Sequence, residues 1–392
     1  MKNKFWIVAL VLALAFALAL TGCGGNEATE PNGNDNDAAE EEIVIGAVFG
    51  LTGDIATFGQ SSKEAIEMAV EEVNAAGGVL GRDVKVIFED NKSLATETAL
   101  AVEKLIESDN VVSVIGAIAS TNTLAGAPVA QDAQIPMVSG TSTNETVTQQ
   151  GDYIFRACFI DPFQGRVAAQ FALEDLDAKT AAILTDVGSD YSMGLRDVFE
   201  ESFIAGGGEV VEKAEFVVQD VDFNSQLTLI KSKNPDVVFV PAYYNSVGLI
   251  LAQAEELGIE ATFIGTDGWD SPTLFDLAGE AANGHYFTNH YSPDADTPEV
   301  KQFIESYGSK YGGKTPDALA ALAYDAFYMT IDAIERAGST EGPAIRDALA
   351  ETEGFVGVSG TITMDENRNP IKSAVIIEIK DQKQVYKTTV NP

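Results

Sequence analysis

The chain has 392 residues, 45% of them hydrophobic, with 24 lysines and arginines against 60 aspartates and glutamates, a formal net charge of −36 at pH 7. This length and apolar content allow a large core and favour two domains over one. Such an acidic chain repels the phosphate backbone of DNA or RNA, so nucleic acid is excluded as an expected partner.

The first residues have the pattern of a secretory leader. Lys2 and Lys4 precede sixteen uncharged, mostly aliphatic residues, 5–20, and the run closes on the sequence LTGC at Cys23. A positive start, an apolar stretch shorter than a membrane span and small residues before a cut predict a signal peptide over 1–22. The ending resembles the bacterial lipobox, which implies a lipid on Cys23 and an extracytoplasmic, membrane-anchored protein. An uncleaved anchor helix is the alternative.

A polar, acidic stretch follows the leader. Residues 23–42 carry no aliphatic side chain larger than alanine and are rich in Asn, Glu, Gly and Asp. Such a segment cannot bury enough surface to fold, and we expect a disordered tether spanning about 25 Å.

From residue 43 onward, short apolar runs alternate with amphipathic stretches. In the first set the expected strands are 43–49, 84–89, 111–117 and 135–139, with helices between them. In the second set helices are expected at 162–176, 193–205, 224–232 and 246–257, and strands at 181–185, 209–218, 237–241 and 262–265. A strand at 285–291, helical segments within 298–353 and a β region at 360–389 complete the chain. The pattern predicts an α/β protein with two doubly wound lobes and a cleft between them.

Hydroxyl-bearing side chains follow two of the first-set strands. Ser120 and Thr121 come after strand 111–117, and Thr141 and Thr143 come after strand 135–139. Ligands of parallel sheets bind outside the carboxyl ends of the strands, so these turns suit a small anion such as a carboxylate. Serine and threonine also cap helices, and the residues alone do not choose between these interpretations.

Four segments resemble the branched-chain amino-acid-type substrate-binding proteins of ABC importers. They are IVIGAVFGLTGDIATFG (43–59), VEEVNAAGGVLG (70–81), the turn at 118–123 and SGTITMDENRN (359–369). The resemblance implies the type I periplasmic binding protein fold, with a three-strand hinge. It implies one lobe from 43–161 and 290–364, and the other from 162–289 and 365–392.

The resemblance also implies a binding site for an amino acid. Ser120, Thr143 and backbone groups near Thr141 fall where the family holds the α-carboxylate. Asp267 falls on the acidic residue that holds the α-ammonium. A zwitterion needs hydrogen-bond donors at one end and an anion at the other, because a charge buried without a partner is costly.

Aromatic residues are expected to close the site. The resemblance implies that Tyr191 and Tyr243 cover the ligand from the second lobe and that Phe58 lies in the first-lobe turn. A tyrosine ring covers apolar atoms while its hydroxyl reaches a polar group. Without the resemblance, a surface or core position is the favoured interpretation of Tyr243 and Tyr244. Trp269 is a further candidate for shaping the side-chain pocket.

The implied function is capture of a neutral, branched-chain amino acid by hinge closure and delivery to a membrane permease with its ATPase. No cofactor, metal or catalytic residue is expected. The main alternative is a module that senses amino acids or small amides and signals instead of transporting them.

One motif suggests another class of protein. Residues 308–315, GSKYGGKT, fit the pattern of a phosphate-binding loop. Such a loop must follow a buried strand and begin a helix. Here the preceding residues have helical spacing and Pro316 follows directly, so we expect a helix–loop–helix segment instead.

Catalytic and metal-binding patterns are weak. His285 and His290 are five residues apart on an expected strand and would point to opposite faces. Asp317, Asp325 and Asp332 are expected to be helix caps or solvated side chains. Cys158 lies in an apolar segment and is expected to be a buried, unpaired thiol.

Overall fold

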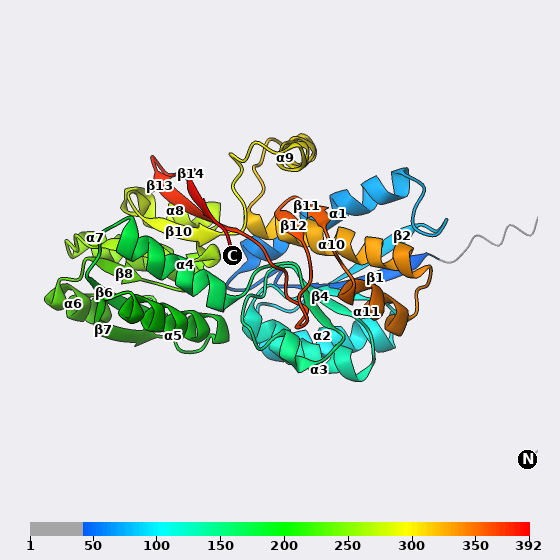
Figure 1. The fold of residues 1–392 in the computed structure, drawn as a ribbon, viewed down its shortest axis with the longest axis horizontal. Helices are drawn as coiled ribbons and strands as arrows, with labels where there is room; N and C mark the ends of the chain where they lie inside the picture. Colours follow the sequence, from blue (N-terminus) through cyan, green and yellow to red (C-terminus); the bar gives the residue numbers. More distant parts are fainter. Residues whose placement is uncertain (1–41) are drawn as a thin grey trace, which may run out of the picture. The chain divides into compact units, whose positions relative to one another are not determined.

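The computed structural model describes residues 42–392 (Figure 1), which belong to one compact unit. The predicted leader, Cys23 and the tether up to residue 41 lie outside the described residues. Within residues 42–392, no helix combines the length and apolar composition needed to cross a membrane.

The first sheet has five parallel strands in the order β2-β1-β3-β4-β5. They are β1 (Ile43–Phe49), β2 (Val84–Asp90), β3 (Val114–Gly116), β4 (Met137–Ser139) and β5 (Ile154–Arg156). The connecting helices are α1 (Ala56–Ala75), α2 (Ala95–Glu107) and α3 (Ser120–Asp132).

Side chains of β1 alternate between two cores, one on each face of this sheet. Ile43 and Ile45 belong to a core that also contains buried residues of α1 and of α10 (Ala318–Ala337). Val48 belongs to a core with buried residues of α2 and α3. Because both faces are covered, the strand is apolar at nearly every position, which is the pattern seen in the sequence.

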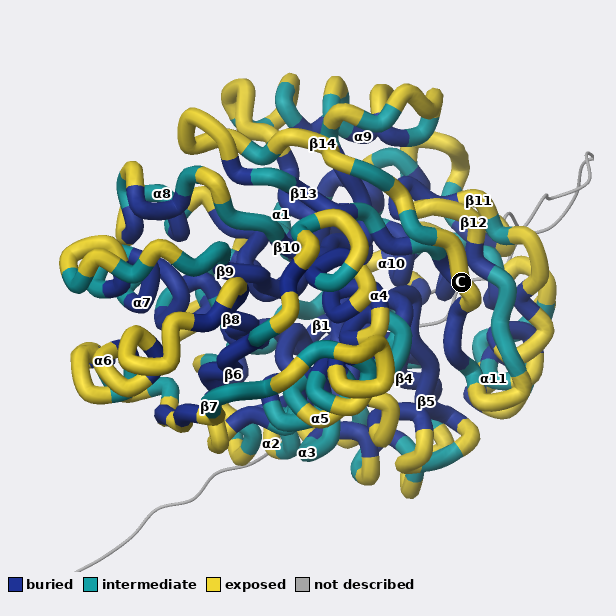
Figure 2. The backbone as a smooth tube through the Cα atoms, turned by 60° about the vertical axis from the view of Figure 1, so that its left-hand side comes forward, coloured by how far each residue is buried: buried dark blue, intermediate teal, exposed yellow. Residues whose placement is uncertain are grey.

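The second sheet has seven strands in the order β14-β13-β10-β9-β8-β6-β7. They are β6 (Thr180–Asp186), β7 (Glu209–Phe216), β8 (Val237–Phe239), β9 (Thr262–Gly265), β10 (Tyr286–Asn289), β13 (Ala374–Lys380) and β14 (Lys383–Val390). β13 runs antiparallel to its neighbours β10 and β14. The tube in Figure 2 is buried along β8 and mostly exposed or half-buried along β14, as expected for an edge strand.

Helices cover both faces of the second sheet. α4 (Asp161–Glu174) and α5 (Asp190–Ala205) contribute to one core. α6 (Asn224–Lys233), α7 (Tyr244–Glu256) and α8 (Pro272–Ala278) contribute to the other. The remaining elements are α9 (Pro298–Lys310), α11 (Gly342–Ala350), β11 (Phe355–Gly357), β12 (Gly360–Ile362) and the short 3-10 helices η1 (Thr148–Gln150), η2 (Asp267–Trp269) and η3 (Gly279–Ala282).

The chain passes three times between the elements around the first sheet and those around the second sheet. The passages lie between β5 and α4, between β10 and α9, and between β12 and β13. The predicted α/β class and the doubly wound arrangement are therefore confirmed.

Two kinds of boundary differ from the sequence-based expectation. β3 and β4 have three residues each, which is shorter than expected. An apolar run indicates burial, but not every buried residue pairs with a neighbouring strand: Val111 and Ala117 are buried and lie outside the strand. α5 and α7 begin earlier than expected, at Asp190 and Tyr244. Their first turns are polar or aromatic and lack the apolar period, although Ser189 caps α5 by accepting from Ser192 N.

Candidate ligand-binding site

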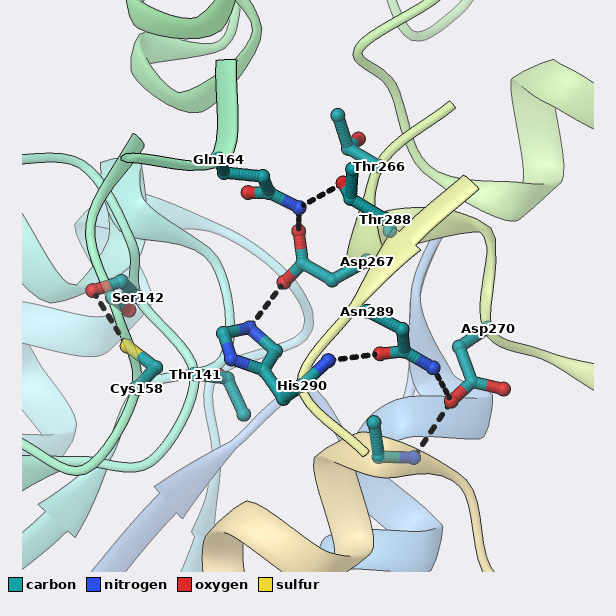
Figure 3. A network of polar contacts seen from close by, with 12 residues as sticks. Thr141, Ser142, Cys158, Gln164, Thr266, Asp267, Asp270, Thr288, Asn289 and His290 are labelled. Carbon is teal, nitrogen blue, oxygen red and sulfur yellow. Dashed lines mark hydrogen bonds and ion pairs between the residues drawn. The ribbon is translucent and has the colours of Figure 1, made fainter. Parts of the chain in front are cut away.

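Asp267 is the centre of a buried polar cluster at the carboxyl end of β9. Asp267 is the first residue of η2 and is 4% exposed. Gln164 Nε2 donates to Oδ1 at 2.8 Å, and His290 Nε2 lies 3.2 Å from Oδ2 (Figure 3). The Tyr191 hydroxyl donates to Oδ1 at 2.7 Å. A carboxylate is stable inside a protein only with partners of this kind.

The partners of Asp267 come from separate elements. Gln164 lies on α4 and also donates to Thr288 Oγ1 at 2.9 Å, while Tyr191 lies in the first turn of α5. His290 follows β10 and its ring stacks on Phe159, with the centroids 3.6 Å apart. Burial lowers the pKa of His290, and the hydrogen bond with Asp267 only partly offsets this, so the ring is neutral at pH 7.

The hydroxyl-rich turns do not act as helix caps. Ala119 is the N-cap of α3 and no side chain caps that helix. Ser120 Oγ instead accepts from Asn144 N at 3.2 Å, and Thr121 Oγ1 accepts from Asp190 N at 3.0 Å. The helix-cap interpretation of these residues is therefore wrong.

Thr141 and Thr143 differ in what their hydroxyls contact. Thr141 Oγ1 donates to Ile118 O at 2.8 Å and is occupied within its own turn. Thr143 Oγ1 is buried and has no hydrogen-bond partner among the described residues. An unpartnered hydroxyl is an exception in a protein interior, where buried polar groups nearly always have partners.

The expected aromatic residues meet beside the cluster. The rings of Tyr191 and Tyr243 stack with centroids 5.1 Å apart, and Phe58 lies edge-on to Tyr243 at 6.4 Å. Burial raises the pKa of Tyr243, the charge of Asp267 adds to this, and the backbone of Ser120 acts in the opposite direction.

Tyr244 has a structural role next to this site. It is buried, its ring lies edge-on to Phe58 at 4.8 Å, and its hydroxyl donates to Thr57 Oγ1 at 3.0 Å. The core interpretation thus holds for Tyr244, whereas Tyr243 is only partly buried.

Trp269 does not shape a side-chain pocket next to Asp267. Its indole is fully buried in the core and donates from Nε1 to Val240 O at 3.0 Å. A Cβ on Gly265 would lie 2.0 Å from this ring, so the glycine leaves the space that the indole fills.

The sequence did not predict Gln164 or His290 as part of the site. Gln164 is fully buried in α4, on the helix face that carries Ala168 and Ala172. A glutamine on an otherwise apolar face was the available signal.

The two histidines do not form a metal pair. His290 lies beside Asp267, whereas His285 Nδ1 accepts from Phe263 N at 3.2 Å. Within residues 42–392, no group of three or more His, Cys, Asp or Glu side chains is placed to hold a metal ion.

Three other expectations were tested. Cys158 is buried and unpaired, as predicted, and its Sγ lies 3.3 Å from Ser142 O (Figure 3). Asp317 caps α10, as expected, by accepting from Ala320 N at 2.7 Å. Asp325 is not solvated: it is 1% exposed and accepts from the backbone N–H groups of residues 358 and 359 at 2.7 and 2.8 Å.

The last two residues of the phosphate-loop-like motif, Lys314 and Thr315, line a separate cavity. This cavity of about 640 Å³ is lined by residues of α1, the segment after β9 and the segment before α10, and its lining does not include Asp267. Lys314 forms an ion pair with Glu64, with Nζ and Oε1 2.6 Å apart. The motif joins α9 to α10, which confirms the helix–loop–helix context and gives no support to nucleotide binding.

A buried acid, an unpartnered hydroxyl and stacked tyrosines near the strand ends of an α/β scaffold are typical of a small-molecule binding protein. The chain belongs to the periplasmic binding protein family, whose sequence profile matches residues 42–384. It is therefore an extracytoplasmic binding protein and not an enzyme.

Individual relatives agree with this assignment. The chain is 31% identical over 330 residues to the Leu/Ile/Val-binding protein BraC3 of Rhizobium johnstonii, covering 84% of this chain and 89% of that protein. The leucine binding protein LivK from Thermotoga maritima has a similar crystal structure, with a TM-score of 0.86 and 41% identity, covering 89% of this chain and 99% of that one. The branched-chain amino acid binding protein LivJ from Streptococcus pneumoniae, solved with isoleucine, has a TM-score of 0.86 and 34% identity over 90% of this chain and 100% of that one. The fold is that of type I periplasmic binding proteins.

Proposed function

We propose that the protein captures a neutral, branched-chain amino acid and delivers it to the membrane permease of an ABC importer. The observation that carries this proposal is the contact set of the buried Asp267: it accepts from Tyr191, and the neighbouring Asp190 N donates to Thr121 in the hydroxyl-rich turn. The names of the relatives, which bind leucine, isoleucine or valine, support the same ligand class.

In the proposed complex the two charged ends of the amino acid are held separately. Ser120, Thr143 and backbone groups near Thr141 bind the α-carboxylate, and Asp267 binds the α-ammonium. Hydrogen bonds to charged groups contribute about 1.5–3 kcal/mol each, so a few of them with modest apolar burial reach the roughly 8 kcal/mol of a micromolar ligand.

The aromatic residues complete this proposed site. Tyr191 holds Asp267 in place, while Tyr243 and Phe58 cover the apolar part of the ligand. Their stacked and edge-on contacts support this role because they leave the rings in defined orientations.

We further propose that binding closes two lobes about the three chain passages. One lobe comprises 43–161 and 290–364, and the other comprises 162–289 and 365–392. The separate sheets support this division, and the hydrogen bonds that join α3 and its neighbouring turn to α5 support a closed arrangement of the lobes. Contacts made only in the closed state favour closure when ligand is present.

A thermal-shift screen against the twenty common amino acids tests the ligand class. Leucine, isoleucine and valine are expected to raise the melting temperature most, because a ligand at one hundred times its Kd stabilises the folded state by about 2.7 kcal/mol. Calorimetry with the best ligand then gives the affinity. If no amino acid raises the melting temperature, the proposed function is wrong.

Delivery and anchoring need separate experiments. Deleting the gene is expected to reduce uptake of radiolabelled leucine, and unchanged uptake with intact binding would favour the sensing alternative. We also propose that Cys23 carries the lipid anchor. The Cys23→Ala protein is expected in the soluble fraction, whereas an uncleaved anchor helix would keep it in the membrane.

A further inference from the structure

Asp161, the first residue of α4, is a buried carboxyl group without a hydrogen-bond partner. The residue is 1% exposed, and neither Oδ1 nor Oδ2 makes a hydrogen bond of normal geometry among the described residues, although the Thr143 hydroxyl lies close enough to lower the pKa of the carboxyl. Its backbone N–H donates to Thr143 O at 2.9 Å, which keeps it next to the unpartnered Thr143 hydroxyl. Buried polar groups nearly always have partners, so this pair needs an explanation.

Unpartnered acceptor atoms also occur on two residues that contact Asp267. Gln164 Oε1, one turn further along α4, and His290 Nδ1 are also buried without partners. The buried Arg156 forms no ion pair with Asp161 among the described residues: its Nη atoms donate to the carbonyls of Ser142 and Asn144, and its Nε has no hydrogen-bond partner. A ligand ammonium group carries three donors and would supply what this part of the site lacks.

We propose that Asp161 is a second carboxylate at the amine end of the site and that, together with Thr143 and Asp267, it holds the ammonium group of the ligand. This inference rests on the proposed function. The ammonium and carboxylate groups of an α-amino acid are attached to one carbon, so Thr143 can reach both of them.

Burial and the charge of Asp267 both disfavour the ionised form of Asp161 in an empty site. Burial raises the pKa of Asp161 well above its ordinary value, the nearby Thr143 hydroxyl partly offsets this, and the charge of Asp267 adds to it. The titratable and charged groups acting around it are Asp267, Glu145, Arg156, Cys158 and Tyr243. Asp161 therefore holds a proton in the empty site and releases it to the buffer when the ammonium arrives.

Calorimetry with L-leucine in two buffers of different ionisation enthalpy, phosphate and imidazole, measures this proton. Between pH 6 and 8 the wild-type protein is expected to release up to one proton per leucine bound. The Asp161→Asn variant is expected to release none and to bind leucine at least tenfold more weakly. The Asp175→Asn variant, at the exposed far end of the same helix, is the matched control and should behave as wild type.

Two further measurements guard against a folding defect. The Thr143→Val variant should also weaken leucine binding, and in the wild-type protein the 2-hydroxy analogue of leucine should bind with no proton released. Unchanged leucine affinity in Asp161→Asn, or no proton release by the wild-type protein anywhere from pH 6 to 8, overturns the inference while leaving the proposed function intact. Absence of any amino-acid binding overturns both.

Discussion

The hydroxyl of Tyr191 lies 2.7 Å from Oδ1 of Asp267 and 2.5 Å from Thr266 Oγ1. It also accepts from Gly268 N at 3.1 Å. A Cβ on Gly268 would lie 2.7 Å from Ala242 O and 3.1 Å from the Tyr191 hydroxyl, so only glycine lets this backbone approach the tyrosine. Tyr191 thus orients the acid of the site from a different helix.

Removing this hydroxyl should weaken ligand binding without unfolding the protein. In Tyr191→Phe the ring can still stack on Tyr243, but Asp267 loses one donor. Because a hydrogen bond to a charged group contributes about 1.5–3 kcal/mol, calorimetry should show leucine binding roughly ten- to hundredfold weaker. Tyr386→Phe, at an exposed position on β14, is the control. Equal affinities for the two variants would mean that Tyr191 does not act on the site.

Asp267 itself should be indispensable. Asp267→Ala breaks a buried ion pair with the ligand ammonium and leaves Asp161 as its one proposed carboxylate partner, which costs about 3–5 kcal/mol of binding free energy. Calorimetry with leucine measures the loss, and the exposed Asp276→Ala provides the comparison. Near-wild-type affinity would remove Asp267 from the site.

The Asp190 peptide links the two proposed lobes. Asn144 Nδ2 donates to Asp190 O at 2.8 Å, and Asp190 N donates to Thr121 Oγ1 at 3.0 Å. Asn144→Ala and Thr121→Val each delete one bond, worth about 0.5–1.5 kcal/mol, which should weaken ligand binding two- to tenfold by disfavouring closure.

Small-angle scattering provides the second measurement for these variants. Without ligand, both should have a larger radius of gyration than the wild-type protein, and saturating leucine should bring them back to the same value. The exposed Asn367→Ala is the control. An unchanged radius together with an unchanged affinity would show that these bonds do not hold the lobes together.

Asp317 should make the folded protein less stable as the pH rises. Burial raises its pKa, and the charge of Asp270 adds to this, whereas hydrogen bonds from Ser61 and from Ala320 N oppose it. The folded state then binds the proton more tightly than the unfolded state. The contribution of protonated Asp317 to the free energy of unfolding is full below the ordinary aspartate pKa of about 4 and is lost as the pH rises toward the pKa of Asp317 in the folded state.

Urea unfolding from pH 4 to pH 8 measures this effect. Asp317→Asn keeps a residue that can cap α10 but cannot ionise, so its stability should fall by about 1 kcal/mol less than that of the wild-type protein over this range. The exposed Asp276→Asn should retain the wild-type slope. A variant slope equal to the wild-type slope would contradict the prediction.

Much of the fold followed from local patterns. The apolar runs of β1 and β9 predicted both strands at their observed ends, because strands covered on both faces are apolar throughout. The starts of α5 and α7 were predicted too late because their first turns lack apolar residues at helical spacing. That spacing is the signal by which a helix is predicted from sequence.

By itself the sequence determined the α/β alternation, the placing of hydroxyl side chains at two strand ends and the candidacy of Asp267. Only the tertiary structure decided that Ser120 bonds to the next turn instead of capping α3, that Trp269 fills the core, and that Gln164, 103 positions away, donates to Asp267. The physical reason is that propensity and period act over a few residues. Which donor meets which acceptor depends on strand order and helix packing, which bring distant β-α units together.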